Sequence, residues 1–97
     1  MGPQAVNTAR GEVAVRLGNE VHVVCLTLGA LAEIEGLLGV SGTEALGARF
    51  QTLSAQEVQA MVGAVLRGGG RAPEGTLPNM TLKEAAAALV AAFEAAS

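Results

Sequence analysis

The segment at residues 27–39, TLGALAEIEGLLG, constrains the fold most strongly, because a strand-like pattern gives way there to a helical one without a spacer. Its apolar residues recur at helical spacing, whereas Glu33 and Glu35 fall off that line. Thr27 can cap the helix by accepting a backbone N–H bond, and Gly39 can supply the left-handed conformation that ends it. We therefore predict a helix over residues 28–38. The residues predicted to face the core are Leu28, Leu31, Ile34 and Leu38.

The residues before this segment predict a β-hairpin over residues 11–27. Over residues 11–17, apolar and polar side chains alternate at period 2, which is typical of a half-buried strand, and residues 20–26 form the return strand. Gly18-Asn19 interrupts the alternation, and glycine at the first central position suits a two-residue type II′ turn. Such a turn places Leu17 opposite Glu20 and thereby fixes the register of the whole hairpin.

This register divides the hairpin side chains between two faces. One face collects Val13, Val15, Leu17, Val24 and Leu26. The other carries Ala14, Val21, Val23 and Cys25 among Glu12 and Arg16. An isolated two-stranded hairpin is marginal in water, so one face must cover helices. The second face is too apolar for free solvent. It contacts another copy of the chain or a partner, or it is buried inside the same monomer, and the sequence leaves both readings open.

The predicted helix over residues 28–38 carries two glutamates that could also contact a partner protein. Glu33 and Glu35 form either a solvated helix face or an acidic patch that faces a partner. Together with the second face of the hairpin they define a candidate partner or self-association surface. Its residues are Val21, Val23, Cys25, Glu33 and Glu35.

Three further helices are predicted, over residues 43–51, 55–67 and 82–96. The second and third of these begin with capping boxes, Ser54 with Glu57 and Thr81 with Glu84. The apolar residues expected to pack are, in chain order, Leu46, Phe50, Val58, Met61, Val62, Val65, Leu66, Leu82, Ala86, Leu89 and Phe93. The last helix is rich in alanine and therefore packs closely on another helix or stays loose until bound.

Composition favours one folded domain of the α+β class over residues 11–97, with a disordered tail at residues 1–10 and a loop at residues 68–80. The chain has 97 residues, of which 51% are hydrophobic and 15% are charged, and this is too apolar for disorder. The net charge is −3, the six basic residues are scattered and only two residues are aromatic, so we expect no nucleic-acid binding. No apolar run approaches a membrane span, and no secretory signal is recognisable, which favours a cytoplasmic protein.

The side chains that could carry chemistry do not form a recognisable site. His22 is the only histidine, it has no partners at ligand spacing, and it lies on the opposite strand face from Cys25. The glycine cluster at residues 68–70 follows a helix instead of a strand and lacks the Lys-Ser/Thr of a phosphate loop. We therefore predict that the protein is not an enzyme and that it has no cofactor and no metal site.

Four short blocks, taken in order, resemble a known family. They are Arg10-Gly11-Glu12-Val13, the LTLGALAEIE run at residues 26–35, Leu53-Ser54-Ala55-Gln56-Glu57-Val58 and Leu66-Arg67-Gly68-Gly69-Gly70. On these blocks the chain resembles the small tail-assembly protein of bacterial gene transfer agents and related tailed phages. The LTLGALAEIE run is the most specific of the four. The connection at residues 71–80 departs from the family pattern.

The resemblance implies a tail-assembly chaperone that coats the tape-measure protein and keeps it soluble until tail-tube subunits polymerise. The expected partners are therefore the tape-measure protein, tail-tube proteins and further copies of the chain, in the bacterial cytoplasm and on assembling tails. Two alternatives remain open: a structural tail-tube or minor tail component that stays in the particle, and a small adaptor that binds one partner helix.

Overall fold

A two-stranded antiparallel hairpin opens the fold, with the register that the Gly18-Asn19 turn predicts. The computed structural model describes residues 6–70 and 77–96. Strands β1 (Glu12–Leu17) and β2 (Glu20–Cys25) pair so that Leu17 lies opposite Glu20. Gly18 has a φ of 65° and Asn19 is not in the positive-φ region, as a type II′ turn requires.

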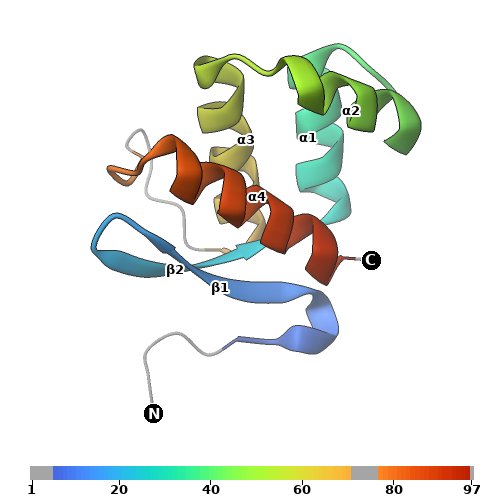
Figure 1. The fold of residues 1–97 in the computed structure, drawn as a ribbon. Helices are drawn as coiled ribbons and strands as arrows, with labels where there is room; N and C mark the ends of the chain where they lie inside the picture. Colours follow the sequence, from blue (N-terminus) through green and yellow to red (C-terminus); the bar gives the residue numbers. More distant parts are fainter. Residues whose placement is uncertain (1–5, 71–76, 97) are drawn as a thin grey trace.

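Helices make up most of the remaining described chain (Figure 1). They are α1 (Leu28–Leu38), α2 (Thr43–Arg49), α3 (Ala55–Gly68) and α4 (Leu82–Ala95), with 3₁₀ segments η1 (Thr8–Arg10) and η2 (Phe50–Thr52). The predicted α+β class, a hairpin followed by four helices, is therefore confirmed.

The predicted helix caps are present in the structure. Thr27 accepts a hydrogen bond from the Ala30 N–H at 3.0 Å, and Gly39 ends α1 with a φ of 70°. Both capping boxes form, with Ser54 and Glu57 at the start of α3 and Thr81 and Glu84 at the start of α4. These local signals therefore fix where the helices begin.

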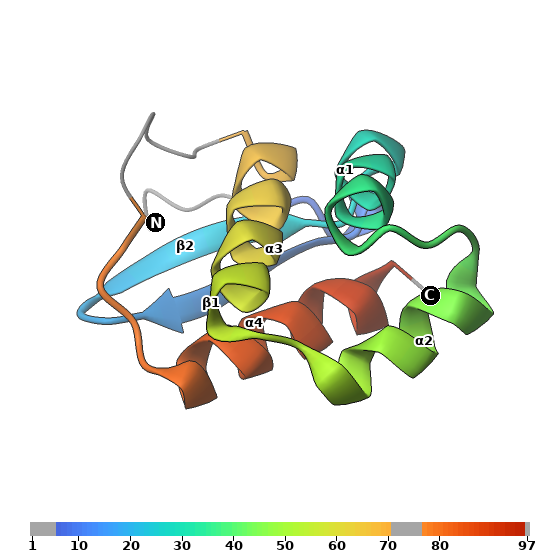
Figure 2. The same ribbon diagram turned by 90° about the horizontal axis from the view of Figure 1, so that it is seen from above.

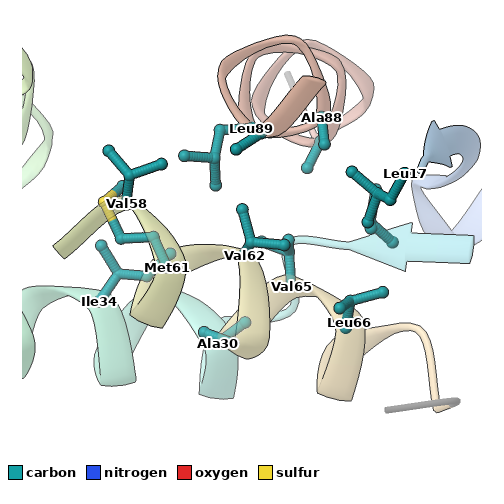
Figure 3. Close-up of a cluster of buried hydrophobic side chains, with 14 of the residues drawn as sticks. Leu17, Ala30, Ile34, Val58, Met61, Val62, Val65, Leu66, Ala88 and Leu89 are labelled. Carbon is teal, nitrogen blue, oxygen red and sulfur yellow. The ribbon is translucent and has the colours of Figure 1, made fainter. Parts of the chain in front are cut away.

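Helices α3 and α4 lie on one face of the hairpin, and α1 packs beside α3 (Figure 2). The N-terminal end of α4 lies near the hairpin turn and its C-terminal end near Gly11, so α4 runs antiparallel to β1. The core forms between these layers, and Figure 3 shows Ala88 and Leu89 pointing from α4 toward the side chains of α3. The fully buried large residues are Leu17, Val23, Val24, Ile34, Leu46, Met61, Val62, Val65 and Leu66.

The glycines at the end of α3 allow this helix to approach the outer edge of β2. A methyl group on Gly68 would lie 2.1 Å from the carbonyl oxygen of Cys25, and one on Gly69 would lie 2.2 Å from that of Val23. No side chain fits at such distances. Gly68 and Gly69 belong to the glycine cluster that the sequence predicts to end the helix. They also cover part of the outer edge of β2, which would otherwise be unpaired.

Some helix-stripe predictions are wrong. Leu28 is 83% exposed and Leu82 is 69% exposed, although both fall on the predicted apolar stripes. In α4 the residues that face the core are mainly alanines: Ala85, Ala88, Leu89 and Ala92. Alanine lets the α4 backbone come close to α3 and β1, and this rotates Leu82 and Ala86 to the outside.

The structure also differs from the sequence-based prediction at the N-terminal tail, at the ends of helices and in the loop after α3. Thr8–Arg10 forms the short helix η1 instead of the predicted disordered tail, and residues 1–5 lie outside the described residues. The helix predicted over residues 43–51 divides into α2 and η2, and Gly68 of the predicted loop belongs to α3. Of the rest of that loop, residues 71–76 also lie outside the described residues, and residues 77–80 are in neither a helix nor a strand.

Candidate functional site

An open apolar groove lies between the N-terminal half of α3, the C-terminal half of α4 and η2. Its volume is about 330 Å³, and we call it the α3–α4 groove. Its lining residues are Phe50, Leu53, Val58, Met61, Ala86, Leu89, Val90, Phe93 and Glu94. Glu94 is the only charged residue among them. A hollow lined in this way offers shape and apolar contact rather than acid–base or metal chemistry.

The two aromatic residues of the chain meet at one end of this groove. The rings of Phe50 and Phe93 are 5.2 Å apart between centroids at an interplanar angle of 87°, which is an edge-to-face contact. Phe50 comes from η2, directly after α2, and Phe93 from the last turn of α4. Phe50 keeps 36% of its surface exposed, so the pair forms a wall of the groove and is not sealed in the core.

Exposed apolar residues continue on both sides of Phe93. Val90 of α4 is 55% exposed and lies on the α3–α4 groove. On the other side, Phe93 also lines a second hollow of about 370 Å³ beside the start of α1, whose lining includes Leu28 and Leu31. The apolar surface therefore extends from α4 across Phe93 to α1. Contiguous surfaces of this kind mark contact sites for other proteins.

An ion pair borders the groove at the start of α3. Arg49 of α2 contacts the carboxylate of Glu57. The backbone N–H of Ser54 and the charge of Arg49 both stabilise that carboxylate, and they lower the pKa of Glu57 from its ordinary value of 4.5 although partial desolvation acts in the opposite direction. The ion pair joins α2 to α3 and thereby holds η2, with Phe50, against the groove.

The sequence-predicted surface is distributed over separate places in the structure. Val21 is 41% exposed, whereas Val23 and Cys25 are each 1% exposed and so have no surface free for a partner. The Cys25 thiol donates to the carbonyl oxygen of Arg10 at 3.3 Å, so η1 covers that end of the second hairpin face. The exposed part of this face consists of Ala14, Arg16 and Val21. Burial inside the monomer is thus observed for Val23 and Cys25, and contact of the exposed part with a partner or a second copy stays a prediction.

Glu33 and Glu35 both have partners within the chain. Glu33 contacts the guanidinium of Arg67 and so links α1 to the end of α3. Glu35 accepts a hydrogen bond from the Gly42 N–H at 2.9 Å and steadies the loop before α2. Internal links account for both carboxylates, and their role toward another protein stays a prediction.

Sequence reasoning missed the α3–α4 groove. The helical periodicity places Phe50, Leu89 and Phe93 on packing stripes, and Val90 carries no signal of its own. The groove becomes visible only when η2 is placed against α4, a contact between segments about 40 residues apart. The sequence shows only that Phe50 and Phe93 are the two aromatic residues of an aliphatic chain. Their partial exposure, which identifies them as part of a surface groove, is not readable from sequence.

The described residues contain no arrangement that points to metal or membrane chemistry. Residues 6–70 and 77–96 hold no group of three or more His, Cys, Asp and Glu side chains placed to bind a metal ion. His22 Nε2 is 3.3 Å from Oε1 of Glu20 without hydrogen-bond geometry. Among the same residues, none of the helices has the length and apolar character needed to span a bilayer.

The chain matches a known protein-family model. The model described as "Phage tail tube protein, GTA-gp10" matches residues 10–96, which include both strands, all four α-helices and every residue of the α3–α4 groove. Comparison with the curated proteins gives no match, and comparison with the solved structures gives none either.

Proposed function

Because this chain belongs to the family described as phage tail tube protein, GTA-gp10, we propose that it is a structural component of a phage-like tail and that it acts through contacts with other tail proteins. The contacts are non-enzymatic. Assembly takes place in the bacterial cytoplasm, where the protein associates with further copies of itself and with tail subunits.

The observation that carries the proposal is the α3–α4 groove. Apolar side chains line it on three elements, and one of them, Val90, is more than half exposed. An apolar side chain of a neighbouring subunit that fills this hollow would be removed from water, which contributes roughly 1.5–3 kcal/mol for a leucine or phenylalanine. Contacts of this kind concentrate binding energy in few residues and suit an assembly built from many copies.

The test is quantitative mass spectrometry of purified tailed particles. A structural component is present at copy numbers comparable with those of the other tail subunits. Particles that assemble normally and contain only traces of the protein would contradict the structural role, because a retained subunit cannot be absent from the finished tail.

A second candidate function is a tail-assembly chaperone for the tape-measure protein. The groove favours it in one respect: an open apolar hollow between two helices can hold one apolar seam of an amphipathic helix, with anchors spaced as i, i+3, i+4 and i+7. Long helical proteins expose such seams and aggregate when these are bare.

Co-expression separates the two candidates. A chaperone keeps co-expressed tape-measure protein in the soluble fraction and is then depleted from finished particles. A structural component is retained in particles, whatever the solubility of the tape-measure protein. Finding the tape-measure protein equally insoluble with and without this chain would rule out the chaperone role.

A further inference from the structure

The outward face of α4 has a charge pattern that is complementary to itself. Lys83 and Glu94 are eleven residues apart, which places them on nearly the same line of the helix about 16 Å apart along its axis. Between them lie exposed Ala86, Ala87 and Val90. Over residues 6–70 and 77–96, neither Lys83 nor Glu94 takes part in an ion pair. The face is thus positive at one end, negative at the other and apolar in the middle.

We propose that this face is a self-association interface, on which α4 of a second copy packs antiparallel across a two-fold axis. In this arrangement Lys83 of each protomer faces Glu94 of the other, and Val90 faces Ala87 of the partner subunit. Such an interface uses the same patch on both chains and closes at a dimer. The small side chains at residues 86 and 87 allow the two helices to approach closely.

A second copy satisfies more of this surface than an unrelated apolar helix would. An apolar helix covers the Val90 region but leaves both end charges without partners. A second α4 covers the same region and forms two ion pairs at the rim, where they set orientation more than affinity. Because Ala86 and Val90 also line the α3–α4 groove, dimer formation covers one side of that groove and competes with other proteins that bind there.

The inference does not depend on the tail role, since it concerns the purified chain alone. The test is sedimentation velocity of the full chain over a concentration series, with three variants. Charge reversal in K83E or E94K turns two attractions into two repulsions and raises the dimer dissociation constant about tenfold at low salt. The double variant K83E/E94K restores complementarity, and its dissociation constant returns to within about threefold of that of the wild type.

Two further variants test the centre of the proposed interface and control for the effect of charge reversal itself. V90E places a carboxylate in the centre of the interface and abolishes the dimer, while circular dichroism verifies that the exposed substitution leaves the fold intact. E44K is the matched control for E94K, because Glu44 is exposed in α2 and lines none of the hollows described above. A chain that is monomeric throughout the series would overturn the proposal. A dimer that V90E leaves intact, or that the double variant does not restore, would overturn it equally.

Discussion

The backbone N–H of Gly18 donates a hydrogen bond of 3.1 Å to the carboxylate of Glu84, although the two residues are 66 positions apart in the chain. The same carboxylate oxygen accepts the Thr81 N–H at 2.9 Å and completes the capping box of α4. One side chain therefore both starts the last helix and ties it to the tip of the hairpin. The contact positions α4 along β1 and, through α4, the Phe93 wall of the groove.

This link predicts a pH dependence of stability. The Thr81 N–H first and the Gly18 N–H second lower the pKa of the Glu84 carboxyl from its ordinary value of 4.5. A carboxyl with a lowered pKa in the folded state stabilises the fold fully above the unfolded value, and it loses that contribution as the pH falls through the folded value. The free energy of unfolding should therefore decrease below about pH 4.5, and E84Q should reduce the slope.

Urea unfolding at a series of pH values measures this effect. Glu57 has a lowered pKa as well, so E84Q removes only part of the dependence. E44Q is the control, because no hydrogen bond to the Glu44 carboxylate is present in the described part of the chain. An E84Q variant whose pH slope equals that of E44Q would show that the Gly18–Glu84 contact does not stabilise the fold.

The close contact between α3 and β2 predicts that Gly69 cannot be replaced by a larger residue without loss of stability. Gly69 has a φ of −78°, which any residue can adopt, so the penalty of G69A comes only from the approach of the new methyl group to the Val23 carbonyl. Overpacking of this kind destabilises by about 1–3 kcal/mol. Gly36 in α1 has no atom within 4 Å of the added methyl group, and G36A should stabilise the protein by about 0.5–1 kcal/mol. Thermal or urea unfolding of the two variants should shift in opposite directions.

The burial of α1 predicts opposite outcomes at two positions of its apolar stripe. Ile34 is fully buried, and I34A should cost about 2–5 kcal/mol of unfolding free energy. Leu28 is mostly exposed, and L28S should change stability by less than about 0.5 kcal/mol. Equal destabilisation by the two substitutions would contradict the orientation of α1, and chemical unfolding decides the question.

Local signals in the sequence predicted the elements well, because their physics is local. The turn at Gly18 fixes the hairpin register, and Thr27, Ser54 and Thr81 each cap a helix with their own side chain. The orientation of α4 was not predictable. Alanine and leucine both count as apolar in a helical pattern, and only close packing against β1 and α3 selects the face with Ala88 over the one with Leu82.

The candidate site was harder to predict than the fold, because it depends on contacts between distant segments. Strand alternation places Val23 and Cys25 on the second hairpin face but does not decide whether that face is buried. In the structure η1 contacts Cys25 on this face, and the end of α3 covers the edge of β2. The groove that replaces them as the candidate contact site requires η2 to lie beside α4. No periodic pattern encodes that placement.

The protein content of purified tailed particles tests the central claim most directly. We predict that quantitative mass spectrometry finds the wild-type chain at copy numbers comparable with those of other tail subunits, and that V90E, which puts a charge on the α3–α4 groove, is strongly depleted. L37E changes an exposed leucine of α1 outside the groove and should be incorporated like the wild type. Absence of the wild-type chain from intact particles, or incorporation of V90E at the wild-type level, would contradict the account.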